Sequence, residues 1–195
     1  MSPVHSLAGV VANLTSGDDE QAEAAAEALA QEGLAAIPAL LQLLRSPIED
    51  RRWWAVRAIA EIDHANARTL LVQALHDPAS AVRQCAAIGL REHADEEALP
   101  ALLEALGSAD RMLARLASDA LAAMGSLAFE ALIEALPSPN AEVRIGVARA
   151  LARSGDGRTI PVLYAALDDS SALVRHYAEG ALERLGLDDV YFQPM

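Results

Sequence analysis

Apolar residues recur along this chain with a period of about 31 residues. Leucines at equivalent places are separated by 31, 31, 30 and 31 residues, and they are Leu44, Leu75, Leu106, Leu136 and Leu167. Within each period the apolar positions lie three and four residues apart, which places them on one face of a helix. One period holds two segments of helical length. Because one such pair cannot bury its own apolar face, the pattern predicts pairs of helices that stack into a solenoid.

Two columns of the aligned repeats describe the first helix of each pair. The alignment takes as its reference positions Gln21, Arg51, Val82, Leu113, Val143 and Val174. The residue eight further on is always a large aliphatic one: Leu29, Ile59, Leu90, Leu121, Leu151 and Leu182. The residue seven further on is never larger than alanine: Ala28, Ala58, Gly89, Ala120, Ala150 and Ala181. A column that never exceeds a methyl group predicts that two helix backbones approach closely in every repeat.

The second helix of each pair carries two predicted core columns. They are Leu40, Leu71, Leu102, Leu132 and Leu163, and, one residue later, Leu41, Val72, Leu103, Ile133 and Tyr164. We expect an opening helix near residues 4 to 14, five complete pairs, and a last first helix near residues 172 to 185. Prolines that begin second helices, glycines that follow first helices and aspartates that can cap first helices agree with this division. They are Pro38, Pro100 and Pro161; Gly33, Gly125, Gly155 and Gly186; and Asp18, Asp50, Asp77, Asp110 and Asp169.

The composition is that of a folded protein with an aliphatic core. Hydrophobic residues make up 53% of the chain and aromatic residues 4%. The repeat continues without a linker, which predicts one array over residues 1–187 and a tail over residues 188–195. The tail contains Tyr191 and Phe192, and two interpretations of it are open. It folds back to cover the apolar flank of the last helix, or it is a docking peptide for a partner.

The charge of the chain limits its partners. A formal net charge of −13 argues against nucleic acid and against anionic membranes, because both bind basic surfaces. No apolar run is long enough to cross a bilayer and no secretion signal is recognised, so we expect a cytoplasmic protein. The single cysteine, Cys85, cannot form an internal disulfide, which fits a reducing compartment. Its column is mostly apolar, which favours a packed thiol over the alternative of a reactive one.

Arginine recurs one residue after the reference position, with an acidic residue two to six positions before it. The arginines are Arg52, Arg83, Arg144 and Arg175, and the acidic residues are Asp50, Asp77, Glu142 and Asp169. We interpret this column as a structural ladder in which each guanidinium binds loop carboxylates or carbonyl groups of a neighbouring repeat. An anion-binding stripe is the alternative. The fourth repeat departs from the pattern, with Ala114 at this position and Arg115 after it.

The most regular block of the repeat begins Asp77-Pro78-Ala79-Ser80-Ala81-Val82-Arg83 and is echoed at residues 140–144 and 171–175. This block resembles HEAT repeats, specifically the short bacterial kind called phycobilisome-lyase HEAT-like repeats, and the resemblance covers nearly the whole chain. It implies an all-α fold, a right-handed α-solenoid of about six stacked helix pairs whose second helices line a concave face. For many members it also implies protein recognition.

Two columns supply candidate binding residues on such a fold. The concave face carries, by position, Gln42, Gln73, Glu104, Glu134 and Ala165. The column two past the reference position is mixed and largely polar, and it contains Trp53 beside a more inward Trp54. Trp53 is either an exposed aromatic anchor for a partner or a cover for the neighbouring repeat. The candidate binding residues are therefore Trp53, Gln73, Glu104, Glu134, Tyr191 and Phe192.

Motifs for catalysis are scarce. The five histidines show no recurring spacing and none is followed by glutamate, so the paired His-Glu motifs of helical-repeat di-iron hydroxylases are missing. The pairs Asp63-His64 and His76-Asp77 lie between helices, and we interpret them as capping or solvated residues rather than metal ligands. Residues 155–158 are glycine-rich but lack the ending of a phosphate-binding loop. We expect no catalytic residue, no metal and no cofactor.

Two functions stay open. The first is a non-enzymatic scaffold or adaptor that binds another protein through the concave face or an edge of the solenoid. The second rests on the resemblance alone: a bilin lyase subunit or chromophore-handling protein that acts on phycobiliprotein-like partners and takes a tetrapyrrole. A tetrapyrrole pocket needs converging histidine, tyrosine, arginine or aspartate side chains, and aromatic residues are few in this chain.

Overall fold

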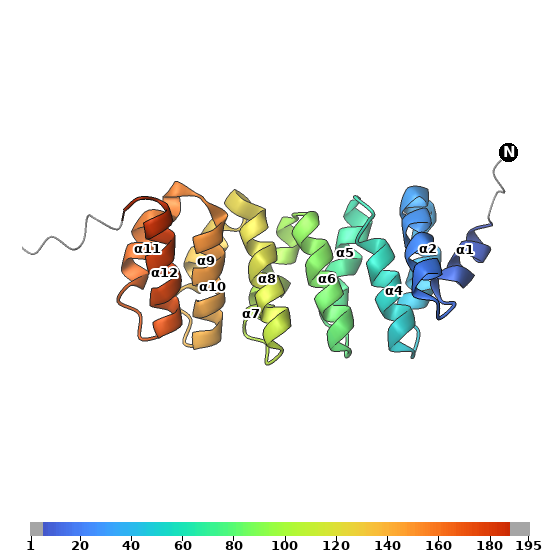
Figure 1. The fold of residues 1–195 in the computed structure, drawn as a ribbon, viewed down its shortest axis with the longest axis horizontal. Coiled ribbons are helices and arrows are strands. Elements are labelled where there is room, and N and C mark those ends of the chain that lie inside the picture. Colours follow the sequence, from blue (N-terminus) through green and yellow to red (C-terminus); the bar gives the residue numbers. More distant parts are fainter. Residues whose placement is uncertain (1–5, 188–195) are drawn as a thin grey trace, which may run out of the picture. The chain divides into compact units, whose positions relative to one another are not determined.

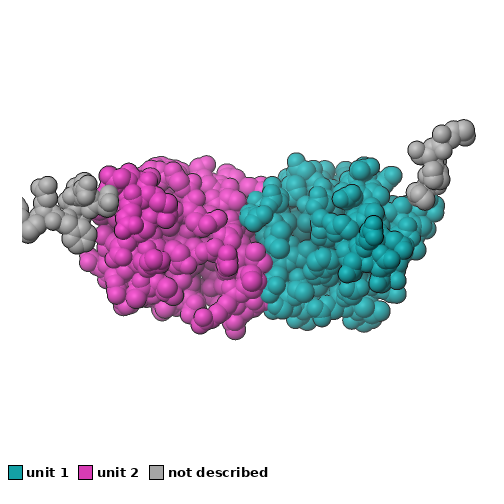
Figure 2. Space-filling view, viewed as in Figure 1, with its two compact units in different colours: residues 1–93 teal, residues 94–195 magenta. Residues whose placement is uncertain are grey.

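The computed structural model describes residues 6–187 of the chain. Within this range the chain forms twelve α-helices and four short 3-10 helices, and it contains no strand (Figure 1). The chain divides into two compact units, residues 1–93 (unit 1) and residues 94–195 (unit 2), which Figure 2 shows in two colours. The predicted all-α fold, with its opening helix, five pairs and last first helix, is confirmed.

Both units are built on one plan: a second-type helix, two complete pairs and a first-type helix. In unit 1 these are α1 (Leu7–Leu14), the pairs α2 (Asp19–Glu32) with α3 (Ile37–Leu44) and α4 (Glu49–Ile59) with α5 (Ala65–Ala74), and α6 (Ser80–Glu92). In unit 2 they are α7 (Leu99–Leu106), the pairs α8 (Arg111–Met124) with α9 (Phe129–Ala135) and α10 (Ala141–Ser154) with α11 (Ile160–Ala166), and α12 (Ala172–Arg184). Residues 92 positions apart are therefore equivalent in the two units.

First helices pack side by side within each unit. In unit 1, α4 packs on both α2 and α6, and in unit 2, α10 packs on both α8 and α12. Each of these central helices also packs on the second helices before and after it, as expected of stacked helix pairs. Short 3-10 helices lead into four of the second helices: η1 (Gly33–Ala35), η2 (Glu96–Ala98), η3 (Gly125–Leu127) and η4 (Gly157–Thr159).

The four predicted core columns differ in burial. The large column of the first helices and the first column of the second helices are buried in every repeat, at 4% exposure or less. The small column is buried except at Ala28, which is half-buried. The column that begins at Leu41 was expected in the core, and this expectation is wrong, because its side chains are half-buried in all five repeats. They border the exposed positions that follow them along the second helices.

Glycine allows the closest helix approach in unit 2. A Cβ atom added to Gly146 of α10 would lie 2.7 Å from Leu106 Cδ2 of α7. Beside this contact the buried hydroxyl of Ser118 in α8 donates a hydrogen bond to the Gly146 carbonyl oxygen at 2.9 Å. Gly89 of α6 is equally confined in unit 1, where an added Cβ would lie 2.7 Å from Ala60 Cβ. Larger residues at these two positions would push the helices apart.

The predicted helix ends are correct in most places. The prolines begin α3, α7 and α11, and the glycines after four first helices adopt positive φ. Asp18 and Asp110 cap α2 and α8. The prediction is wrong at Asp50, which lies in the first turn of α4. It is also wrong at Asp77 and Asp169, which lie two residues before the cap residues of α6 and α12 and accept the amide hydrogen bonds of those residues at 2.8 Å and 2.7 Å.

Among the described residues no single helix is both long and apolar enough to cross a membrane. The segments Asp19–Ala35 and Ile37–Leu44 meet that test by length and composition only when taken together, and they are bent by 117° at their junction. The predicted tail over residues 188–195, with Tyr191 and Phe192, lies outside the described residues. A single array over residues 1–187 stays a prediction.

Candidate binding surfaces

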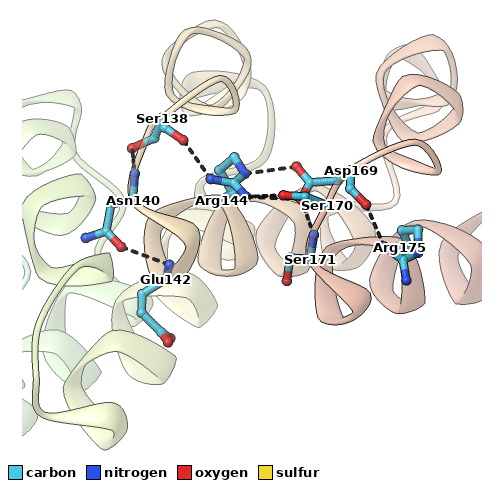
Figure 3. A network of polar contacts seen from close by, with 8 residues as sticks. All are labelled: Ser138, Asn140, Glu142, Arg144, Asp169, Ser170, Ser171 and Arg175. Carbon is cyan, nitrogen blue, oxygen red and sulfur yellow. Dashed lines mark hydrogen bonds and ion pairs between the residues drawn. The ribbon is translucent and has the colours of Figure 1, made fainter.

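Two arginines of the predicted ladder join consecutive repeats. Arg144 in α10 forms a bidentate ion pair with Asp169, from Nε to Oδ2 at 2.9 Å and from Nη2 to Oδ1 at 3.2 Å (Figure 3). Its Nη1 donates to the carbonyl oxygen of Ser138 at 2.9 Å. At the equivalent place in unit 1, Arg52 binds Asp77 at 2.8 Å and 2.9 Å in the same two-pronged geometry. The carboxylate partner lies 25 residues after each arginine, in the loop before the next first helix.

The other two arginines of the column bind carbonyl groups. Arg83 Nη1 donates to the carbonyl oxygen of Asp77 at 2.8 Å, and Arg175 Nη1 donates to that of Asp169 at 2.6 Å (Figure 3). Each aspartate therefore accepts an arginine from the preceding repeat on its carboxylate and one from its own repeat on its carbonyl oxygen. The structural role of this ladder stays a prediction.

Ion pairing lowers the pKa of both aspartates in the ladder. The Arg144 guanidinium, and then the amide of Ser171, hold the pKa of the Asp169 carboxyl below its usual value. Burial by itself would raise the pKa of the Asp77 carboxyl, but the hydrogen bonds from Arg52 and from the Ala79 amide outweigh burial and lower that pKa. Both side chains are therefore charged at neutral pH.

The second-helix face carries the other candidates named from sequence. We define the second-helix face by an exposed column and by the half-buried column that begins at Leu41. Gln73 in α5, Glu104 in α7 and Glu134 in α9 are all exposed, and Glu130 adds a third exposed carboxylate in unit 2. The exposed column is Gln42, Gln73, Glu104, Glu134 and Ala165. Each unit thus presents polar side chains beside apolar ones that are only half covered.

Trp53 lies in the wall of a groove between α4 and α6 in unit 1. Its side chain is half-buried, and its ring meets the buried ring of Trp54 edge to face, with centroids 4.8 Å apart. The groove, which we call the Cys85 groove, has a volume of about 660 Å³. Its lining includes Trp53, Arg57, Glu61, Cys85, Ile88 and Glu92. The other two aromatic candidates, Tyr191 and Phe192, lie outside the described residues.

Cys85 is held as a thiol in this groove. Burial raises its pKa to about 11, against a smaller lowering by Arg57. The side chain is 7% exposed, and such a thiol carries little thiolate at neutral pH.

In the equivalent groove of unit 2, arginines take the place of the two glutamates. It lies between α10 and α12, has a volume of about 670 Å³, and we call it the arginine groove. Arg153 and Arg184 stand where the Cys85 groove has Glu61 and Glu92, and Arg149 occupies the place of Arg57. The rest of the lining includes Leu151, Leu163, Tyr177 and Ala181, and among residues 6–187 no carboxylate lines the groove.

The ion pairs beside the two grooves mirror each other. In unit 1 one arginine, Arg57, binds two carboxylates, those of Glu23 and Glu61. In unit 2 one carboxylate, that of Asp119 in α8, binds two arginines, with Arg149 Nη2 at 2.8 Å and Arg153 Nε at 3.2 Å. The first cluster has one excess negative charge and the second has one excess positive charge.

A second groove in unit 2 adjoins the arginine groove. It lies between α8 and α10, has a volume of about 370 Å³, and shares Arg149 and Tyr177 with the arginine groove. Arg111 and Arg115 add positive charge to its lining, and Glu142 adds one carboxylate. Sequence reasoning missed both grooves. Their signal was present in the columns six and ten after the reference position, where Arg149, Arg153 and Arg184 occur.

Groups of metal-ligand type are sparse in the described part of the chain. Over residues 6–187 no three histidine, cysteine, aspartate or glutamate side chains are grouped so that they could hold a metal ion. His93 Nε2 lies 2.8 Å from the carbonyl oxygen of Ala60, and its Nδ1 lies 3.6 Å from Asp63 Oδ1. These contacts tie the end of α6 to the loop after α4.

Paired helices stacked in this way define an α-solenoid repeat protein. The model of the HEAT repeats family matches residues 7–84, 37–122 and 102–183, which together cover most of the chain. The protein belongs to the HEAT repeat family, and the predicted solenoid fold is confirmed.

Similar proteins refine this assignment to the lyase type of HEAT-like repeat. "Uncharacterized phycocyanin operon protein Z" of Pseudanabaena tenuis is 31% identical over 157 residues, which are 75% of this chain and 78% of that protein. "Phycocyanobilin lyase subunit beta" of the same organism is 39% identical over 125 residues, 57% of this chain and 43% of that protein. The chain thus spans less than half the length of that lyase subunit.

A solved structure has a similar fold. The complex of CpcE and CpcF of phycocyanin lyase from Nostoc sp. PCC7120 contains a chain that aligns with a TM-score of 0.59 and 24% identity, over 74% of this chain and 96% of that one. At this identity the likeness shows the fold alone. The predicted resemblance to lyase-type HEAT-like repeats is confirmed by the sequence relatives and by this fold.

Proposed function

We propose that this protein is a scaffold or adaptor that binds another protein on its second-helix face. The observation that carries the proposal is the pairing of two columns on that face: an exposed polar column and a half-buried apolar one. Contact surfaces of transient complexes combine apolar area with a polar rim in this way. Stacked repeats form an extended surface, and such surfaces are what repeat proteins use for binding.

The charge of the face indicates the chemistry of the partner. In unit 2 the exposed positions include Glu104, Glu130 and Glu134, and no arginine or lysine occurs within α7 or α9. Complementary charge favours encounter with a partner that presents basic residues beside apolar ones. The net charge of −13 argues against nucleic acid as that partner. We also infer a cytoplasmic location, which the single buried thiol supports.

A role in chromophore attachment is the second candidate function. Its support is the 39% identity to a phycocyanobilin lyase subunit and the 31% identity to a phycocyanin operon protein. In that case the protein handles a tetrapyrrole on a phycobiliprotein-like partner, alone or as one subunit of an enzyme. Titration with phycocyanobilin tests it directly: a shifted visible absorbance band supports the role, and an unchanged spectrum at saturating protein contradicts it.

Site-specific photo-crosslinking in native extract tests the scaffold function. A photoreactive phenylalanine analogue replaces Glu104 in one variant and Glu134 in another, both in unit 2, and it replaces the exposed first-helix residue Glu179 of the same unit in the control. The proposal predicts one protein crosslinked from both second-helix positions and absent from the Glu179 control. Crosslinks to that protein from Glu179 alone contradict the proposed face.

A further inference from the structure

The arginine groove has the dimensions of a small-molecule site. Its volume of about 670 Å³ lies within the range of ligand pockets, roughly 300–1,000 Å³. Leu151, Leu163 and Ala181, which line it, are 2%, 1% and 3% exposed. They give the groove an apolar floor, while its arginines supply polar groups around that floor.

Two of the three arginines, Arg149 and Arg184, are held in place by contacts within the protein. Arg149 Nη1 donates to the carbonyl oxygen of Arg115 at 2.9 Å, and its Nη2 binds Asp119. Arg184 in α12 donates from Nη2 to the carbonyl oxygen of Ala152 in α10 at 3.0 Å. A guanidinium has five donors, so each of these arginines keeps donors beyond the contacts that fix it. Side chains fixed in this way lose little freedom when a ligand binds.

The net charge of the side chains in and beside the arginine groove indicates the charge of its ligand. Three arginines line the groove, and Asp119, which does not line it, neutralises one of them. Within the described residues, two positive charges are left without a carboxylate in the lining. This occurs in a chain with a net charge of −13, and the equivalent groove of unit 1 has glutamates at two of the three places.

We propose that the arginine groove binds an elongated organic dianion, whose apolar body covers the floor and whose two carboxylates are bound by the arginines. Guanidinium groups bind carboxylates in a bidentate manner, which fixes the orientation of the ligand as well as its charge. The three arginines lie on the first helices α10 and α12, outside the two columns that define the second-helix face, so the inference does not rest on the scaffold function.

Titration with bis-anilinonaphthalene sulfonate, a fluorescent dianion with an apolar body, tests the site in the full-length protein. The double variant Arg153→Gln and Arg184→Gln changes two exposed arginines, so the fold is retained. Arg57→Gln in the Cys85 groove and Arg158→Gln elsewhere in unit 2 are the matched controls. We expect the double variant to raise the Kd at least tenfold, and the two controls to leave it within about twofold. Equal affinity of the double variant and the wild type, or an equal loss in Arg57→Gln, overturns the site.

Competition defines the ligand class. Dodecanedioate, with a carboxylate at each end, should displace the dye at a lower concentration than dodecanoate, which has one. Displacement should weaken in 0.5 M salt because the groove is open to solvent. Equal displacement by the two acids overturns the two-carboxylate assignment. Tighter binding of a hexaglutamate peptide than of either acid overturns the small-molecule assignment in favour of an acidic protein segment.

Discussion

The Cys85 groove and the arginine groove overlap in position in two copies of one architecture, and the arginine groove extends further, onto Leu163 of α11. They lie between equivalent first helices, and their volumes are about 660 Å³ and 670 Å³. Yet Glu61 and Glu92 in unit 1 are replaced by Arg153 and Arg184 in unit 2, and the ion pairs beside them reverse their signs. The positions that stack the repeats are shared, while the outward positions carry opposite charges. Stacking therefore leaves the outward positions free to differ, and the proposed dianion site uses them.

The largest effect on stability is expected at the core leucines, which occupy the same buried columns in both units. Leu40 in unit 1 and Leu132 in unit 2 are equivalent and are 0% and 1% exposed. Replacing either with alanine should lower the free energy of unfolding by about 2–5 kcal/mol, because a cavity is left between stacked repeats. Gln73→Ala on the second-helix face should change it by less than about 0.5 kcal/mol. Chemical denaturation measures all three, and similar midpoints for Leu132→Ala and Gln73→Ala would show that the aligned columns are wrong.

Two glycines of unit 2 should respond in opposite directions. Gly146→Ala brings a methyl group within 2.7 Å of Leu106 and should cost about 1–3 kcal/mol. At Gly180 in α12 an added Cβ would meet, among the described residues, only Arg184 Nη1, at 3.5 Å. Gly180→Ala should therefore stabilise the protein by up to about 1 kcal/mol through helix propensity. Thermal melts of the two variants decide this, and a loss of stability in both would mean that α12 packs more tightly than described.

The reversed ion pairs should differ in their contribution to stability. Asp119→Asn removes the one carboxylate from two arginines, and Arg149 beside it has a side chain only 13% exposed. We expect a loss of about 1–3 kcal/mol. Arg57→Gln leaves Glu23 and Glu61, which are 41% and 46% exposed and can be solvated, so the loss should stay below about 1 kcal/mol. Denaturation curves compare the two variants, and a larger loss for Arg57→Gln contradicts the difference between the clusters.

The ladder should make stability depend on pH in a defined direction. The folded-state pKa of Asp169 is lowered, so its contribution is fully present above the ordinary pKa of about 3.9 and is lost as the pH falls through the folded value. Asp169→Asn should therefore melt at a lower temperature than wild type at neutral pH, and the gap should close below about pH 4. The exposed neighbour Asp168 supplies the control, Asp168→Asn. A gap that persists unchanged at low pH would assign the effect to packing instead of charge.

Periodicity predicted the stacking because every repeat needs the same inward residues. Leu29, Ile59 and Leu90 occupy one column because each fills the same buried place in its repeat, and this recurrence is visible in the sequence. The ladder was visible as a column of arginines, but its geometry was not, because Arg52 pairs with Asp77 in the next repeat and not with Asp50 two positions before it. The column that begins at Leu41 is predicted to be buried but is half-buried. Helical spacing of leucines gives the same pattern for a buried column and for a half-buried one.

The grooves could not be predicted from a single column. Their lining combines residues from consecutive first helices, such as Arg153 in α10 and Arg184 in α12, which lie 31 positions apart. Only the packing of α10 on α12 brings these side chains to one concavity. A table of charges at the outward columns would have shown the excess of arginine in unit 2, but not the apolar floor beneath it.

The claim that outward positions alone distinguish the two units is tested most directly by placing the arginines of one groove in the other. The variant Glu61→Arg and Glu92→Arg gives the Cys85 groove the arginines of its counterpart, while Glu23 remains to bind Arg57. Titration with bis-anilinonaphthalene sulfonate then counts the sites at which dodecanedioate displaces the dye. Two displaceable sites, against one in the wild type, are the predicted result. One site in the folded variant would contradict the claim, because the shared architecture would then not suffice to form the second.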